Sequence, residues 1–528
     1  MEQLSSIDAS FIQAESPSLP MHVTTVGIYD PSTAPEGTVR FRDIMECYER
    51  AIYEVPLLRR RLVQVPGNLD FPYWIEDPDF DIEFHVRHMA LPQPGDWRQF
   101  FIQVARMNSR VLDLQRPLWE VYVLEGLNAL EGIPSGSFAV MQKLHHAAMD
   151  GNAVRKLLSA LHTDAPPSTK TPSRHNEPLV RERRPTAMPL LLKSYQRALG
   201  RPGKFTRTVA KSLRGVRRLN KAREAGEVGK RLEPPRSIFN GEVSPHRVVS
   251  AASVDFEQFR QLRHAVPGAT ISDLAVSVMG GALRRYMAHR GVALDDPLVA
   301  RVPVSVRPDA VADELDNRVS TISVSSGSHI ADPLARLQAV CASSVAAKRR
   351  LEIMGDSLQA DLADALGPQV SRAVFSMAEN ASRFQALSSL LPAGHNFSFS
   401  NLPGPADPVY LCGAQYKYGM GLDPLMPNIG IVVTLASSVG RFVFGVNACR
   451  EKVPDPEVLW QCIHDSHDEM QEKLRDLAVA NLAGERTKGS KSRKPADKSG
   501  KKARKKASTK KTGSRAKAAG SKKQAKSG

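Results

Sequence analysis

Two adjacent histidines are followed by an aspartate and a glycine in the run His145 to Gly151, which reads His-His-Ala-Ala-Met-Asp-Gly. A neutral imidazole is a competent general base near neutral pH. Adjacent side chains leaving a strand point to opposite sides, so His145 and His146 cannot have the same role. The Asp150 carboxylate can cap a following helix or bind a buried arginine, and Gly151 lets the chain turn tightly. The spacing therefore predicts a proton-transfer centre in which one histidine faces a reaction channel.

Two other interpretations of the histidine pair are a metal site and a purely structural role. Vicinal histidines on a strand diverge and no third ligand is evident, so we expect no metal here. A structural pair would need no Asp-Gly at this spacing. A second histidine-rich run, His464 to Asp468, lies on a predicted C-terminal helix, and we interpret it as a solvated polar face.

Two strands and a helix must position the run from His145. Residues 117–124 and 138–144 are rich in apolar, aromatic and β-branched side chains and are bounded by proline or by Pro-Ser-Gly, which predicts strands. Residues 152–162 then repeat leucines at helical spacing. Such alternation of strands and helices predicts an α/β or α+β fold.

A second globular part is expected over residues 237–482. Its predicted elements are a helix over residues 274–287, in which Gly280-Gly281 permits close packing, strands at 299–306, 396–400, 429–435 and 441–449, and a helix that begins at Asp455-Pro456 and runs to about residue 478. We therefore predict domains at residues 1–169 and 237–482, separated by a basic connector at 170–236 and followed by a disordered tail at 483–528.

The net charge of +17 is concentrated in two segments. Residues 486–528 hold 18 Lys and Arg against one acid, which leaves 54 basic and 54 acidic residues elsewhere. This tail contains no large apolar residue, so it cannot bury a core. A polycation of this density is expected to bind nucleic acid or anionic lipid, and the alternative is a solubilising extension with no dedicated partner.

The connector at residues 170–236 contains a basic amphipathic pattern. At about 100° per residue, Phe205, Val209, Leu213, Val216 and Leu219 share one arc of the helix and a set of lysines and arginines takes the other. The pattern predicts docking on an anionic lipid surface. The alternative is a connector helix that packs its apolar stripe on the protein.

The five cysteines are scattered, and none are at Cys-x-x-Cys spacing, which argues against a disulfide framework or a zinc site. The N-terminus lacks the basic and apolar regions of a signal peptide, and no apolar run reaches the roughly 18 residues of a membrane span. We expect a cytoplasmic protein that is either soluble or attached to a surface from one side.

The run from His145 resembles the motif of the CoA-dependent acyltransferase superfamily, which includes chloramphenicol acetyltransferase and peptide-synthetase condensation domains. The chain resembles more closely the bacterial wax ester synthase/diacylglycerol acyltransferase family, through segments in the same order over about residues 4–450. These segments are Leu4 to Asp8, Pro20 to Val23, Pro117-Leu118-Trp119, the histidine motif, Phe239-Asn240-Gly241, Pro303 to Arg307, and Ser400 to Pro405.

The resemblance implies two chloramphenicol-acetyltransferase-like domains with an active-site tunnel between them. It implies that His146 is the general base, that His145 and Asp150 support it, and that Arg307 is a candidate partner of Asp150. The implied co-substrate is acyl-CoA, with no cofactor, and the acceptor is diacylglycerol or a long-chain alcohol. The absence of Gly-x-Ser-x-Gly agrees with direct transfer. The candidate substrate-binding residues are Ser272, Asp273, Ser400, Asn401, Pro117 and Trp119.

One position departs from the family pattern, because Ser272 stands where the family has asparagine before Asp273. A serine hydroxyl can still cap the helix, while an altered acceptor preference would follow if the amide binds substrate. The sequence also allows two other functions. One is an acyltransferase that uses a carrier-protein thioester, and the other is a non-catalytic tether at lipid droplets or nucleic acid that uses the basic tail.

Overall fold

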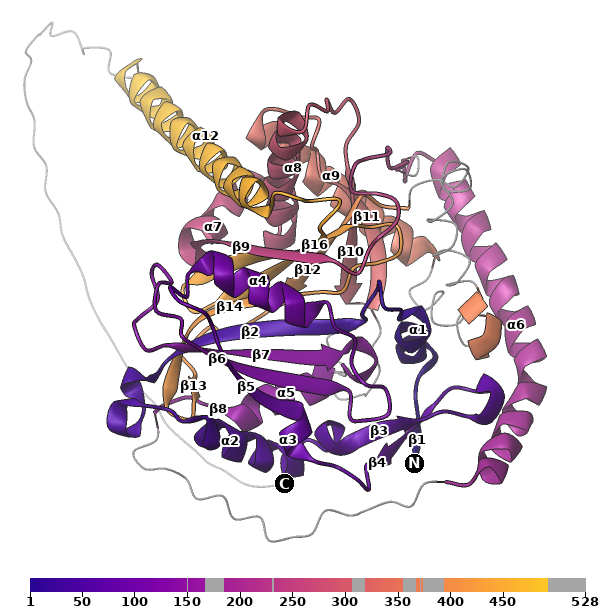
Figure 1. The fold of residues 1–528 in the computed structure, drawn as a ribbon. Coiled ribbons are helices and arrows are strands. Elements are labelled where there is room, and N and C mark those ends of the chain that lie inside the picture. Colours follow the sequence, from indigo (N-terminus) through magenta and orange to yellow (C-terminus); the bar gives the residue numbers. More distant parts are fainter. Residues whose placement is uncertain are drawn as a thin grey trace, which may run out of the picture. The chain divides into compact units, whose positions relative to one another are not determined.

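The computed structural model describes residues 1–149, 151–166, 185–229, 232–305, 319–354, 367–370, 372–373 and 394–491. The chain divides into two compact units, Met1–Arg475 and Asp476–Gly528. Strands and helices alternate through the first of these units (Figure 1), which confirms the mixed α/β fold class predicted from the sequence. The predicted domain boundaries stay a prediction.

A seven-stranded sheet carries the histidine motif, with the strand order β5-β6-β7-β2-β14-β13-β8. Its central strands pair antiparallel, and the β2–β7 register places His22 directly opposite His145. The predicted strands at 117–124 and 138–144 are confirmed as β6 and β7. The strands are β2 (His22–Asp30), β5 (Val86–Ala90), β6 (Trp119–Glu125), β7 (Phe138–His145), β8 (His162–Thr163), β13 (Tyr410–Leu411) and β14 (Ala414–Leu422).

A six-stranded sheet has the order β11-β10-β12-β15-β16-β9. The pairs β10–β12 and β12–β15 are parallel, and the others are antiparallel. The strands are β9 (Arg247–Asp255), β10 (Val299–Ser305), β11 (Val319–Ser325), β12 (Phe397–Leu402), β15 (Ile431–Ser438) and β16 (Arg441–Cys449), so the four strands predicted for this half are confirmed. A small sheet of β1 (Glu2–Gln3), β4 (Tyr73–Glu76) and β3 (Arg60–Val63) lies beside the N-terminus.

Helices cover both sheets, and α4 lies between β2 and β9 (Figure 1). Its buried residues join a hydrophobic core that takes side chains from both sheets, including Val26 of β2 and Val249 of β9. The helices are α1 (Ser6–Ala14), α2 (Phe41–Glu54), α3 (Ile82–His85), α4 (Trp97–Asn108), α5 (Gly151–Leu161), α6 (Ala187–Glu224), α7 (Phe256–Leu262), α8 (Ile271–His289), α9 (Pro333–Met354) and α12 (Pro456–Lys491).

Strand β14 links the two halves of the first unit. It lies in the chain between β12 and β15 of the six-stranded sheet, yet it pairs with β2 in the seven-stranded sheet. Two glycines allow β14 to cross β16 closely, because a Cβ added at Gly445 would lie 2.3 Å from the carbonyl oxygen of Gly421. The C-terminal half thus supplies a strand to the sheet that carries the histidine motif.

Helix α8 packs against α9 and α12 through the predicted glycine pair. A Cβ at Gly280 would lie 2.0 Å from the Ser326 carbonyl oxygen, and one at Gly281 would lie 2.2 Å from the Ser466 hydroxyl. The buried Arg336 guanidinium of α9 fills the adjacent space and donates to the Ser277 carbonyl oxygen at 3.0 Å. The close packing expected of Gly280-Gly281 is confirmed.

Helix α12 differs from the sequence prediction in two respects. It begins at Pro456 as predicted, but it continues to Lys491, beyond both the expected end near residue 478 and the predicted start of the tail. The run His464 to Asp468 is only in part the solvated polar face that we predicted, because Asp465 and Asp468 are exposed. Ser466 is buried against α8, where its hydroxyl donates to the Val278 carbonyl oxygen, and the buried His467 stacks on Phe259 of α7. The expected disorder of residues 492–528 falls outside the described residues.

The cysteines also differ from expectation, because Cys47 of α2 and Cys412 form a disulfide. The two residues are 365 positions apart, so sequence spacing gave no sign of the contact. Cys341, Cys449 and Cys462 are free. Every helix among the described residues is too short or too polar to span a lipid bilayer.

The packing of α8 predicts the effect of a small enlargement. Gly280→Ala should lower the free energy of unfolding by about 2 kcal/mol, because the added methyl group meets backbone that cannot rotate away. Urea unfolding followed by circular dichroism measures this. The matched control is Gly203→Ala on α6, where nothing lies within 4 Å of the new Cβ and a gain of about 0.5–1 kcal/mol is expected. Equal midpoints for Gly280→Ala and the unmodified chain would contradict the packing argument.

Candidate active site

The histidine motif begins where β7 ends and the chain turns into a short 3-10 helix, His146–Ala148. The His145 backbone N–H donates to the Leu118 carbonyl oxygen at 3.0 Å, and that of His146 donates to the Met21 carbonyl oxygen at 2.8 Å. Neighbouring strands therefore hold the backbone of both histidines. The switch from strand to helix separates the directions of the two imidazoles, as predicted.

His145 points inward and is fully buried. Its Nδ1 accepts a hydrogen bond from the Ala147 backbone N–H at 3.0 Å, so a neutral ring carries its proton on Nε2. That Nε2 lies 3.3 Å from the Glu15 carboxylate, close enough for attraction although it is not aligned for a hydrogen bond. Glu15 also accepts from the Met21 backbone N–H at 3.1 Å. His145 therefore fastens the motif to the end of α1.

His146 occupies a different environment. Its ring stacks on Phe11 of α1, with ring centroids 3.8 Å apart, and its Nδ1 is buried with no hydrogen-bond partner among the described residues. Burial lowers the pKa of His146 to about 4, and the positive charge of Arg301 acts in the same direction. The residue as a whole is nevertheless only half-buried. A neutral imidazole that is desolvated and still accessible is what a general base requires.

The strands beneath the motif carry further buried charge. Lys143 of β7 donates to the Arg110 carbonyl oxygen at 2.7 Å and lies 3.4 Å from Glu120, and burial lowers the pKa of Lys143 to about 8. Burial also lowers the pKa of His22, with the nearby charges of Lys143 and His145 acting in the same direction. The histidines here are thus surrounded by positive groups, which keeps them neutral.

Two residues that the sequence did not single out come from the other half of the molecule. Arg301 of β10 is the cation that acts on His146, and its guanidinium lies 3.2 Å from the Thr321 hydroxyl. Asp423 follows β14 at once, and burial raises its pKa, while hydrogen bonds from Ser400 and Thr434 and the charge of Arg301 lower it. Neither residue belongs to a recognisable sequence pattern. Asp423 comes close to Arg301 because β14, the strand just before it, crosses between the sheets.

The structure brings one of the predicted substrate-binding pairs close to this cluster. Ser400 of β12 hydrogen-bonds Asp423. The positive charge of Arg301 acts on both Asp423 and His146. Asn401, the next residue along β12, is exposed. Alternation of side chains along a strand explains the difference, and Ser400 is the member of the pair that faces the site.

Asp273 and Ser272 begin helix α8. The Asp273 carboxylate accepts from the backbone N–H of Thr270 at 3.0 Å and from its hydroxyl at 2.7 Å, while the Thr270 hydroxyl accepts from the Asp273 N–H at 3.1 Å. This reciprocal capping satisfies the free donors of the helix start. The cap is therefore Thr270 and not Ser272, the residue that we expected to cap the helix. Ser272 itself is half-buried.

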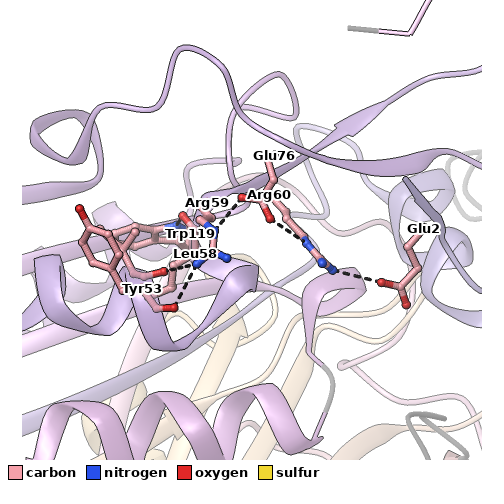
Figure 2. A network of polar contacts seen from close by, with 8 residues as sticks. Glu2, Tyr53, Leu58, Arg59, Arg60, Glu76 and Trp119 are labelled. Carbon is pink, nitrogen blue, oxygen red and sulfur yellow. Dashed lines mark hydrogen bonds and ion pairs between the residues drawn. The ribbon is translucent and has the colours of Figure 1, made fainter. Parts of the chain in front are cut away.

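Pro117 and Trp119 flank the motif through the backbone of β6. Both are buried, and the Trp119 indole N–H donates to the Leu58 carbonyl oxygen at 2.7 Å. Figure 2 shows that this tryptophan lies beside a polar network in which Arg59 and Arg60 share the Glu76 carboxylate. The network holds the segment after α2 against β6, so these contacts support a positioning role. Contact of Pro117 or Trp119 with substrate stays a prediction.

The remaining predicted site residues are Asp150, Arg307 and Gly151. Asp150 and Arg307 lie outside the described residues, so their pairing stays a prediction. Gly151 is the first residue of α5. Within the described part of the chain, no group of three His, Cys, Asp or Glu side chains is arranged to hold a metal ion.

Two family models match most of the chain. Residues 4–275 match the wax ester synthase/diacylglycerol acyltransferase catalytic domain, and residues 315–471 match the C-terminal domain of the same family. A putative diacylglycerol O-acyltransferase of Mycobacterium tuberculosis is 31% identical over 89% of this chain and 91% of its own length. A probable diacylglycerol O-acyltransferase of the same species is 29% identical over 90% of this chain and 100% of its own.

Solved structures agree on the fold. The wax ester synthase/diacylglycerol acyltransferase of Marinobacter aquaeolei matches with a TM-score of 0.59 and 23% identity, covering 89% of this chain and 99% of that one. The trichothecene 15-O-acetyltransferase of Fusarium sporotrichioides matches with a TM-score of 0.53 and 12% identity, covering 89% and 94%. These sequence matches show that the chain belongs to the wax ester synthase/diacylglycerol acyltransferase family.

Proposed function

We propose that this protein transfers a long-chain acyl group from acyl-CoA to the hydroxyl of diacylglycerol, forming triacylglycerol, and to fatty alcohols, forming wax esters. The observation that carries the proposal is His146, a neutral and desolvated imidazole at the end of β7 that faces Arg301 from the other half of the molecule. Family membership and the names of the Mycobacterium relatives support the substrate class.

The proposed reaction needs one base and no acyl-enzyme. The His146 imidazole takes the proton of the acceptor hydroxyl, whose oxygen attacks the thioester carbonyl carbon. The tetrahedral intermediate then collapses, the C–S bond breaks, and the imidazolium gives its proton to the departing thiolate sulfur. Nearby positive charge, from Arg301 in particular, makes the imidazolium short-lived and so favours this second transfer. We propose that His145 holds the base in place and that Asp150 and Arg307 support the loop.

Two alternatives use the same fold differently. A carrier-protein thioester would replace acyl-CoA, and a phosphopantetheinylated carrier tested beside acyl-CoA distinguishes the two donors. A non-catalytic tether would need only the basic tail, residues 486–528, which we propose as a site for anionic lipid or nucleic acid. Residues 492–528 of this tail fall outside the described residues. The intact environment of His146 argues against a protein that has lost catalysis.

We also propose that helix α6 attaches the enzyme to an anionic surface of the cytoplasmic membrane or of lipid droplets. Its apolar residues Met188, Leu192, Tyr195, Val209, Leu213 and Val216 are exposed, Leu213 by 55%. At 100° per residue they fall within an arc of roughly 120°. The opposite face rests on the protein, where Leu190 is buried and Gly215 meets the backbone of Met354 in α9.

The position of this exposed stripe favours lipid over internal packing. Three of the apolar residues identified in the sequence, Val209, Leu213 and Val216, point to solvent, whereas a connector helix would bury them. Arg207, Arg214, Arg217 and Lys221 follow one edge of the stripe. An apolar stripe beside a row of cations suits the boundary between acyl chains and anionic head groups.

Removal of the proposed base should stop turnover. His146→Ala should lower kcat for transfer from palmitoyl-CoA by about a thousandfold, the scale of general-base catalysis. Radiolabelled palmitoyl-CoA with diacylglycerol and hexadecanol as acceptors, followed by separation of triacylglycerol from wax ester, measures both activities. The exposed His289→Ala serves as the control and should be fully active. Unchanged turnover in His146→Ala would sink the mechanism.

The environment of His146 sets the acid side of the pH profile. A base is active when unprotonated, and the pKa of His146 is lowered from 6.5 to about 4. We therefore expect kcat/KM to hold as pH falls through 6.5 and to drop only as pH approaches 4. Initial rates between pH 4 and 8, corrected for enzyme inactivation, provide the measurement. An acid limb centred near 6.5 would show that His146 is not the desolvated base.

The stripe on α6 predicts a loss of membrane binding. Leu192→Gln/Leu213→Gln should weaken binding to vesicles containing anionic lipid by at least about tenfold, since burying one leucine is worth about 1.5–3 kcal/mol. Vesicle sedimentation measures the binding. A matched pair on other exposed surfaces, Leu158→Gln/Val345→Gln, should bind as the unmodified protein does. Equal binding by the two double variants would rule out α6 as the lipid-docking surface.

A further inference from the structure

A cavity of about 860 Å³ lies beside α4, between the two sheets. One face of α4 forms one wall, from Trp97 to Ser109, while β9 and the first turns of α12 form the others. Its volume is in the upper part of the range for sites of small organic ligands. We call it the arginine cavity, after the cations that line it: Arg98, Arg106, Arg247, Lys417, Arg441 and Arg450.

The five arginines of the cavity lie near three carboxylates, those of Glu131 and Glu457 in its wall and that of Glu451, whose charge acts on Arg247. None of the five forms an ion pair with a carboxylate among the residues that the structure describes, whereas buried Arg61 and Arg336 each pair with one. Arg247 is buried and donates only to backbone carbonyl oxygens, those of Ser244, His246 and Ser18. A cluster of unpaired guanidinium groups in a concave site is suited to an anion with several charges, above all phosphate groups.

Two further polar atoms in the cavity wall have no partner. The Ser250 hydroxyl belongs to a residue that is only 5% exposed, and it has no hydrogen-bond partner among the described residues. The same is true of the buried Nε2 of His464. Buried polar atoms without a partner are uncommon in folded proteins, so a ligand that supplies hydrogen bonds is expected here.

Aromatic rings flank the cationic part of the cavity. Trp97 and Phe101 of α4 stack with ring centroids 5.5 Å apart. Trp460 of α12 borders the cavity with 38% of its surface exposed. Flat rings near clustered arginines suit a purine base attached to phosphates, because a base stacks on an aromatic face while the phosphates take the cations.

The cavity walls continue towards the histidine motif. Val249 of the wall pairs in register with Asn447 of β16, whose side-chain amide donates to the Asp423 carbonyl oxygen at 2.9 Å. Asp423 in turn faces Arg301, beside His146. Along the other wall, α4 ends at Asn108, whose side-chain oxygen accepts a hydrogen bond from the Thr24 hydroxyl at 2.7 Å. Thr24 lies two residues after His22 on β2. These contacts connect the cavity walls with residues next to the histidine motif, although none of the motif residues that the structure describes lines the cavity itself.

We propose that the arginine cavity binds the phosphorylated adenosine of the acyl donor, with its 3′-phosphate and diphosphate on the arginines and its base against Trp97 or Trp460. The thiol arm then extends along α4 towards His146. This inference rests on the proposed function, since it names the part of the molecule that takes the leaving group of the transfer. It assigns the donor to the side of the site bordered by α4, β9 and α12.

The test compares two donors that differ only in the nucleotide. Arg106→Gln/Arg441→Gln removes two exposed cations that hold no ion pair within the described residues. We expect the KM for palmitoyl-CoA to rise by roughly tenfold or more, while kcat/KM for palmitoyl-pantetheine, which lacks the nucleotide, stays as in the unmodified enzyme. The control, Arg42→Gln/Arg349→Gln, removes two exposed arginines outside the cavity. Equal effects on both donors, or on neither, would overturn the assignment.

A binding measurement keeps this inference separate from the proposed function. Isothermal titration with adenosine 3′,5′-bisphosphate should show binding to the unmodified chain, undiminished in His146→Ala and weakened roughly tenfold in the cavity variant. Nucleotide binding by a chain without transfer activity would refute the proposed function and support the site. Transfer activity without nucleotide binding would refute the site alone. Loss of affinity for anionic vesicles in the cavity variant, with nucleotide binding unchanged, would identify a lipid head group as the ligand and overturn the proposal.

Discussion

Burial of the His146 imidazole next to positive charge is the interaction on which the rest of the site depends. Protonation of this ring would place a cation, stripped of water, near Arg301, so the ring stays neutral well below the usual pKa of histidine. The neighbouring His145, fastened by Glu15 and the Ala147 N–H, fixes the turn that presents the ring. In the proposed reaction this ring takes the proton of the acceptor hydroxyl and gives it to the departing thiolate, and no acyl-enzyme forms.

That environment exists only because the two sheets share components. Strand β14 leaves the six-stranded sheet, crosses β16 where glycines permit close backbone contact, and pairs with β2 beside the motif strand β7. Its last residue precedes Asp423, and so the crossing delivers the carboxylate that accompanies Arg301. A change that disturbs the crossing therefore acts on the proton-transfer centre from a distance, through packing and not through direct contact.

Charge is distributed to match molecules that are part lipid and part polyanion. Helix α6 turns two groups of apolar side chains outward, at residues 188–195 and 209–216, with cations along one edge, which suits the boundary of a lipid phase. The arginine cavity holds its cations in a concave site between α4, β9 and α12, which suits a compact, highly charged group. In the two proposals made above, these surfaces separate the water-soluble end of one substrate from the lipid phase that supplies the other.

The sequence determined the local features: the histidine motif, the strands and helices around it, the glycine pair of α8, and the family, because these depend on short-range periodicity and on residues close together in the chain. It did not show the β14 crossing, the Cys47–Cys412 contact, the Thr270 cap in place of Ser272, or the burial of His467. Nor did it reveal Arg301, Asp423 or the arginine cavity, whose members come from strands and helices far apart in the chain. These were decided by tertiary structure alone, since pKa values, unpaired charges and cavities arise from which distant side chains exclude water from one another.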